Sequence, residues 1–130
     1  MGDTIVKPKI SKEILSKLQS QMVEERQVTL HCCYKSEFFE EEKIRIWSST
    51  YLLDRHSDHI SKLIHIENIS LSPNWTDLPF NKEYWFTLVF EGLPKNCKVF
   101  DFIELIHQDG GFFKEGIVRN GSDVYRLTLD

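Results

Sequence analysis

The sequence predicts a mainly β protein: an antiparallel, two-sheet, immunoglobulin-like sandwich of about seven strands with one N-terminal α-helix. Short runs rich in β-branched and aromatic residues recur through residues 27–130, and turn-forming residues interrupt them about every eight to twelve positions. No helical periodicity lies between these runs, so parallel βαβ units are not expected. A small barrel, built from the same kind of strand, is the runner-up architecture.

Two apolar runs, residues 84–91 and 99–107, are the centre of this predicted fold. Residues 92–98 lie between them and contain glycine, proline and asparagine, which favour a turn. We expect the two runs to form a central hairpin that holds much of the core. The predicted core residues are Leu30, Ile46, Phe86, Leu88, Phe90, Phe100, Phe102 and Leu127.

The N-terminal region is predicted to contain a leader and one helix. Residues 1–10 are expected to form a flexible leader, where Pro8 opposes regular structure. Ser11 can cap an amphipathic helix over residues 11–26. The apolar positions of this helix follow helical spacing at Ile14, Leu15, Leu18 and Met22. We expect the helix to pack against the domain formed by residues 27–130; the alternative is that it binds a second chain.

The first predicted strands show the alternation of a sheet with two different faces. Residues 27–34 place Leu30 and Cys32 on one face, and His31 and Cys33 on the other. Residues 43–48 form the second strand, which residues 50–53 continue after a bend. The inward residues of this second strand are Ile44 and Ile46, and those on its other face are Arg45 and Trp47.

Two of the later strands contain interruptions. Residues 62–71 change parity between Ile66 and Ile69, which predicts a β-bulge or a bend. The second central run changes parity after Phe102. Two prolines make residues 72–79 a loop.

The last two predicted strands cover residues 113–119 and 123–129. Asn120-Gly121 lies between them, and both residue types tolerate positive φ. We therefore expect these strands to form a tight hairpin.

Charge and composition limit the partners that we expect. The 130-residue chain has a net charge of −4, with acids clustered at 37–42, which argues against a nucleic-acid binder. No apolar run approaches the roughly 20 residues of a membrane helix, so no membrane partner is expected. Three cysteines, two of them adjacent, are a poor disulfide framework. Together with the missing signal-peptide pattern, they favour the cytoplasm.

Histidine and cysteine residues offer candidate metal and nucleophile sites. His56 and His59 resemble half a zinc site, and Cys32 and Cys33 are the other ligands that could be proposed. Adjacent residues of a strand point to opposite faces, so the two cysteines should not converge on one ion. Cys33 shares a face with His31, but no orienting third group accompanies this pair. We therefore predict neither a metal nor another cofactor.

Carboxylates inside apolar strands supply the rival, enzymatic interpretation. Asp101 and Glu104 could serve as the general acid and base of a small hydrolase if one cleft held both. The favoured interpretation for these residues is structural: they accept hydrogen bonds from the backbone of a bulge or loop.

The candidate partner-binding surface combines the loop 72–79 with the turn 54–61, which we expect to be neighbours. Trp75 would be a rigid anchor, and Asp58 and Asp77 would form an acidic rim suited to a basic partner. His56 and His59 would add pH sensitivity. The alternative, weighed about equally, is that Trp75 is buried and fixes the loop to the core.

Several motifs resemble those of a recurring, largely uncharacterised bacterial module of immunoglobulin-like type. They are IRIW (44–47), TYLL (50–53), KLIHIENI (62–69), FTLVFEGLP (86–94) and FDFIE (100–104). In that module an L-x-x-A-E-N-I-like strand precedes an F-x-L-x-F-x-x-L-P strand and an F-D-L-I-E-like strand; here Ile66 replaces the usual alanine. The resemblance covers about residues 43–130 and implies an immunoglobulin-like fold, but no activity and no catalytic residues.

These observations together predict a non-enzymatic binding or protein-interaction module of bacterial type, with another protein as its partner. A dimer would form through the N-terminal helix or a sheet edge.

Overall fold

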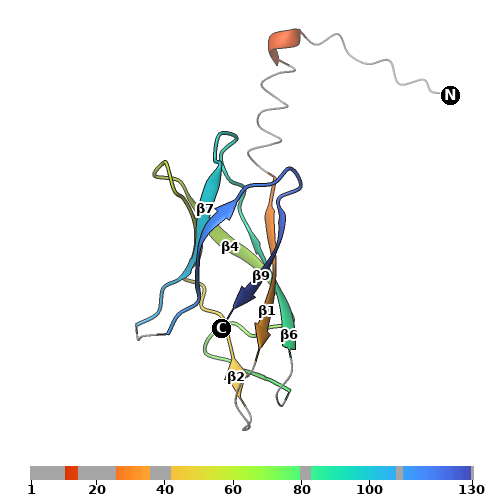
Figure 1. Cartoon of the computed structure of the whole chain (residues 1–130), viewed down its shortest axis with the longest axis vertical. Coiled ribbons are helices and arrows are strands. Elements are labelled where there is room, and N and C mark those ends of the chain that lie inside the picture. The colour runs from red at the N-terminus through yellow and green to blue at the C-terminus, as the bar shows by residue number, and fades with distance from the viewer. Residues whose placement is uncertain (1–10, 15–25, 36–41, 80–82, 108–109, 130) are drawn as a thin grey trace, which may run out of the picture.

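The computed structural model describes residues 11–14, 26–35, 42–79, 83–107 and 110–129 (Figure 1). The described part is mainly β, as predicted, with a seven-stranded and a two-stranded sheet.

The N-terminal helix is described only at its start. Residues 12–14 are helical, and the Ser11 hydroxyl accepts a hydrogen bond from the Ile14 N–H at 3.2 Å, which confirms the predicted cap. The rest of the helix predicted over 11–26, and the leader predicted over 1–10, lie outside the described residues. Within the described ranges, no helix has the length and hydropathy that crossing a bilayer would take.

The larger sheet is mixed. Its strands lie side by side in the order β8 (Phe113–Val118), β7 (Val99–Glu104), β3 (Thr50–Asp54), β4 (Ile60–Glu67), β6 (Glu83–Phe90), β1 (Val28–Lys35) and β9 (Val124–Leu129). Strands β1 and β9 run parallel, whereas the other neighbouring pairs are antiparallel. The prediction of a wholly antiparallel fold is therefore wrong, because alternation along a strand records its faces but not the direction of its neighbour.

The larger sheet curls until it is nearly a barrel. Its two edge strands, β8 and β9, are joined only by residues 119–123 (Figure 1). The small sheet pairs β2 (Lys43–Ile44) with β5 (Thr76–Asp77), and a parallel bridge joins Ile46 to Leu71 nearby. This architecture is closer to the small barrel, the runner-up prediction, than to two stacked sheets.

The central hairpin predicted over 84–107 does not form. Strand β6 lies between β4 and β1, whereas β7 lies between β3 and β8. The two strands face each other across the interior, where the rings of Phe90 and Phe102 make an edge contact at 6.1 Å. The connecting segment, residues 91–98, runs from one side of the barrel to the other, and its own Leu93 and Cys97 are buried. The turn-forming residues of 91–98 therefore belong to a connection between two sides of the barrel, not to a tight hairpin.

The Asn120-Gly121 hairpin is likewise wrong, since β8 and β9 lie at opposite edges of the sheet. The Asn120 side-chain oxygen accepts hydrogen bonds from the N–H groups of Ser122 and Asp123 at 3.0 and 2.8 Å. Asp123 has a φ of 55°, in the left-handed region. A side-chain-capped turn therefore replaces the expected two-residue loop.

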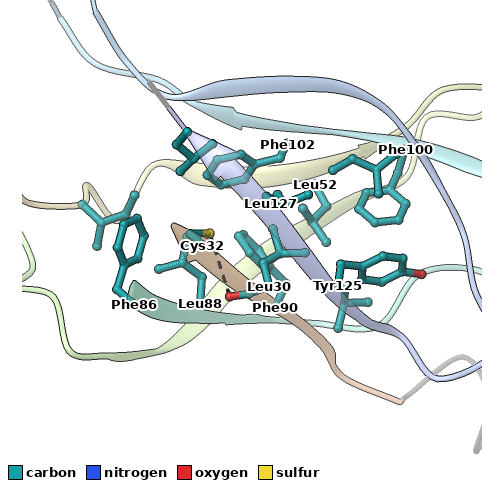
Figure 2. Packing of buried hydrophobic residues seen from close by; sticks show 14 of the residues in the cluster. Leu30, Cys32, Leu52, Phe86, Leu88, Phe90, Phe100, Phe102, Tyr125 and Leu127 are labelled. Carbon is teal, nitrogen blue, oxygen red and sulfur yellow. Dashed lines mark hydrogen bonds between the residues drawn. The ribbon is translucent and has the colours of Figure 1, made fainter. Parts of the chain in front are cut away.

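The eight predicted core residues are all buried, and ten residues of the cluster are labelled in Figure 2. Strand β7 alternates regularly, with Phe100, Phe102 and Glu104 facing inward, so the parity change predicted after Phe102 is wrong. The strand break predicted between Ile66 and Ile69 is found, because β4 ends at Glu67 and Asn68 has a φ of 63°. A register shift of β4 against β6 lies earlier, between Leu63 and His65.

Candidate binding site

The two loops of the predicted partner surface lie at opposite ends of the barrel. The turn after β3 contacts the upper end in Figure 1, where the His59 Nε2 atom lies 3.1 Å from the Gly92 carbonyl oxygen and the Arg55 N–H donates to Val99. Trp75 lies beside Arg45, which precedes β3. The structure therefore does not bring His56, Asp58 and His59 together with Trp75, and the predicted acidic rim does not form.

Trp75 is a surface residue, with 51% of its area exposed. The guanidinium carbon of Arg45 lies 3.9 Å from the centre of the Trp75 ring and 5.4 Å from that of Trp47. The Arg45 Nη1 group also donates a hydrogen bond to the Pro73 carbonyl oxygen at 3.3 Å. Trp75 is thus held by a cation–π contact, not by insertion into the core.

The segment before β3 carries Arg45 and Trp47 on one face, because alternate residues of an extended chain point to the same side. Its alternate residues Ile44 and Ile46 are buried, which confirms their predicted inward direction. Arg45 and Trp47 are less buried than these two and lie on the other face, as predicted, together with Lys43. Lys43 is 3.9 Å from an oxygen of Asp77, whose side chain is 85% exposed.

These residues border a cleft of about 200 Å³, which we call the Trp75 cleft. It is lined by Tyr34, Lys43, Ile44, Arg45, Trp47, Trp75, Glu104, Ile106, Gly110 and Phe112. Small-molecule sites usually have volumes of about 300–1,000 Å³. The Trp75 cleft is therefore better matched to a side chain or two of a partner than to a cofactor.

Glu104 is buried among the residues that line the cleft, with 8% of its area exposed. One carboxylate oxygen accepts the Trp47 N–H at 2.9 Å, and the other accepts the Phe112 N–H at 3.1 Å. Burial raises the pKa of Glu104 above its usual value, although these two amides and the charge of Arg45 act in the opposite direction. The side chain therefore holds two parts of the cleft lining at a fixed separation.

Asp101 and Glu104 do not share a site. Glu104 faces inward, whereas Asp101 alternates to the other face of β7. One oxygen of Asp101 accepts hydrogen bonds from the Arg55 guanidinium and the Gly116 N–H, both at 2.8 Å. Gly116 has a φ of 69° and lies opposite the register shift between β7 and β8. Both carboxylates thus accept hydrogen bonds from bulge or loop backbone, as the structural interpretation predicts.

The three cysteines are buried and unpaired by disulfides. Burial raises the pKa of Cys32 to about 12 and that of Cys97 to about 11, and it also raises the pKa of Cys33. The ring of His31, the candidate partner of Cys33, lies 2.9 Å from the Thr87 hydroxyl. In the described part of the chain, no cluster of His, Cys, Asp and Glu has the geometry of a metal site.

The opposite end of the barrel holds another buried carboxylate, Asp123, which is fully inaccessible to solvent; Asp54, the last residue of β3, is also buried. Arg119 donates to both of its oxygens at 3.1 and 3.0 Å, and the Tyr125 hydroxyl donates at 2.9 Å. Arg26 adds an ion pair at 3.1 Å. Arg119 also donates to the carbonyls of Leu93 and Pro94. We call Asp123, Arg119, Arg26 and Tyr125 the Asp123 network.

The pKa of Asp123 reflects this pairing. Burial alone would raise it, but the hydrogen bonds from Arg119 and Tyr125 and the charges of Arg119 and Arg26 outweigh burial and lower it. The network therefore stabilises an ionised carboxylate and ties the 91–98 crossover to the segment before β9.

Sequence reasoning identified Trp75 but missed Arg45 as its partner and Glu104 as part of the same cleft. The predicted alternation over 43–48 already placed Arg45 and Trp47 on one outward face, so it carried a usable signal for that half of the site. No sequence pattern places Glu104 beside them, because that contact depends on how β3 and β7 pair.

Comparison with protein-family models, with curated proteins and with solved structures finds no match to this chain.

Proposed function

We propose that the chain is a non-enzymatic protein-interaction module and that the Trp75 cleft is its binding surface. The observation that carries this proposal is a half-exposed tryptophan held flat against an arginine at the edge of a cleft. Tryptophan and arginine are the residue types most enriched among the side chains that dominate protein–protein affinity. Because Trp75 is already held in place, little conformational entropy would be lost when a partner covers it.

The placement of the carboxylates supports the binding module over the small hydrolase. A paired acid and base would need to reach one substrate. Asp101 and Glu104 face opposite sides of β7, and the hydrogen bonds described above engage both carboxylates with backbone or arginine donors. The exposed groups of the cleft are aromatic and cationic side chains, which suit recognition.

The proposal has three further parts, which concern location, family and assembly. The three unpaired, buried cysteines are in keeping with a cytoplasmic location. The motifs at 86–94 and 100–104 coincide with β6 and β7, the two facing walls, in keeping with membership of the bacterial immunoglobulin-like module. A dimer would use the N-terminal helix or the edge strand β8.

Affinity capture with matched variants tests the proposal. The full chain, its Trp75→Ala variant and its Trp85→Ala variant are immobilised and exposed to lysate of the source cell, and bound proteins are quantified by mass spectrometry. Trp85 is the control because it is also about half exposed, at 43%, and also lies near an arginine, Arg126, at 5.5 Å. We expect a partner that Trp75→Ala loses and Trp85→Ala retains. A partner that Trp75→Ala retains would place the binding surface elsewhere.

A further inference from the structure

Building on the proposed function, we propose that the Trp75 cleft binds a protein segment that presents an acidic side chain to Arg45. The proposal names the chemistry of the partner: a carboxylate of Asp or Glu that meets the guanidinium, with neighbouring apolar atoms against the exposed surface of Trp75. It is the reverse of the basic partner that the sequence suggested, because the acidic rim on which that suggestion depended does not form.

Arg45 is prepared for a carboxylate by its surroundings. The guanidinium is packed against Trp75 and near Trp47, which limits its side-chain freedom before any ligand arrives. An arginine carries five N–H donors in a planar fork, and among the described residues the Pro73 carbonyl is the hydrogen-bond acceptor of Arg45. The remaining donors can bind a carboxylate in the bidentate geometry that makes such pairs strong and directional.

Arg45 forms no ion pair among the described residues, whereas Lys43 lies near Asp77, and the whole chain carries a net charge of −4. The cleft lining holds the cations Lys43 and Arg45 and the carboxylate of Glu104, and the carboxylate of Glu42 lies beside it, 3.4 Å from the Tyr34 hydroxyl. Both oxygens of Glu104 already accept backbone N–H groups. Asp77 lies 3.9 Å from Lys43, and its exposed side chain can turn away into water. A phosphate backbone is a poorer candidate because binding it takes a row of cations, and the cleft lining supplies two.

The second arginine–tryptophan pair of the barrel offers an internal comparison. Arg126 lies 5.5 Å from the centre of the Trp85 ring, a looser contact than the 3.9 Å of Arg45 on Trp75. The hollow beside Trp85 is lined by His31, Glu67 and Asn68 as well as Arg126, so it has no excess of permanent positive charge. We therefore expect an acidic ligand to choose Arg45.

A displayed library of random peptides of about a dozen residues tests the proposal with the full chain as bait. The most enriched peptide is synthesised with a fluorescent label, and its dissociation constant is measured by polarisation. We expect Asp or Glu in the enriched peptides, binding that weakens as salt rises, and a loss of about tenfold or more for Arg45→Gln. Arg126→Gln, the matched control, should bind as the parent chain does.

Charge reversal makes the test specific. A peptide whose acidic residue is replaced by lysine should bind the parent chain poorly and bind Arg45→Glu better than it binds the parent. Thermal melting of each variant confirms that it is folded. Enriched peptides without acidic residues, or equal affinity for the parent and Arg45→Gln, would overturn the proposal, as would preferential binding of a labelled single-stranded oligonucleotide.

The variants separate the two proposals. If Trp75→Ala abolishes peptide binding but Arg45→Gln does not, the cleft is the binding surface and its acidic preference is wrong. If neither substitution affects the selected peptides, or no peptide is enriched, both the acidic preference and the binding role of the cleft fail.

Discussion

Asp123 and Glu104 are buried carboxylates at opposite ends of the barrel, and their surroundings differ; Asp54 is buried as well. Asp123 is paired with Arg119, Tyr125 and Arg26, and Arg119 also donates to the Pro94 carbonyl, so the network joins three chain segments. Among the described residues, the hydrogen-bond donors to Glu104 are backbone N–H groups, and the nearby arginine, Arg45, is packed against Trp75 at the surface. Burial alone therefore does not indicate whether a carboxylate has a structural or a functional role. The groups that compensate the charge distinguish the end held together by the Asp123 network from the end at which we propose that Arg45 meets a partner.

The largest effect is expected at the end held together by the Asp123 network. Asp123→Asn keeps a residue that tolerates the positive φ at this position but removes the negative charge from a buried pair. Arg119, with a side chain only 9% exposed, would be left uncompensated. We expect a loss of about 3–5 kcal/mol of unfolding free energy, measured by urea denaturation.

Asp77→Asn is the control for that substitution, because its side chain is 85% exposed and its contact with Lys43 spans 3.9 Å. A change within about 0.5 kcal/mol is expected there. Equal effects of the two substitutions would remove the distinction between a paired buried carboxylate and an exposed one.

The contrast between the ends reflects what the sequence can and cannot predict. Alternation correctly placed Phe86, Phe90 and Phe100 in the core, because the two faces of a strand differ in hydrophobicity. It did not reveal that β6 and β7 belong to different walls, since pairing depends on contacts between segments distant in the chain. The Trp75 cleft shows the same limit: Trp75 and Arg45 are visible in the sequence, but their stacking is not.

The dependence of stability on pH in the acidic range should differ between Asp123 and Glu104. The pKa of Asp123 is lower in the folded chain than its usual 3.8, so its contribution is present above that value and is lost as pH falls through the folded pKa. The pKa shift of Glu104 affects stability in the opposite direction. Its pKa is raised from 4.5, so its contribution to the free energy of unfolding is fully present below pH 4.5 and is lost as pH rises through the folded pKa.

Melting temperatures measured from strong acid to neutral pH test both of these pH dependences. In Asp123→Asn the fall of stability in strong acid should become shallower. In Glu104→Gln, stability should decline less than in the parent as pH rises above about 4.5. A Glu104→Gln variant whose profile follows that of the parent at every pH would show that Glu104 is not protonated more readily in the folded state.

A smaller loss is expected from Glu104→Gln at neutral pH. Glutamine retains one acceptor oxygen for the N–H of Trp47 or Phe112, but its amide nitrogen cannot accept the other. An unsatisfied buried N–H costs about 1–3 kcal/mol, and removing a desolvated charge offsets part of that cost. We expect a net loss of about 1 kcal/mol by urea denaturation, well below the loss from Asp123→Asn.

The most direct measurement is the unfolding free energy of Trp75→Ala, because the contrast between the ends requires that Trp75 contributes little to stability. Its visible contact is an exposed cation–π stack on Arg45. We predict a loss of no more than about 1 kcal/mol in urea denaturation at neutral pH. A loss of about 3–5 kcal/mol, the usual cost of truncating a buried large aromatic, would contradict this and make Trp75 part of the core.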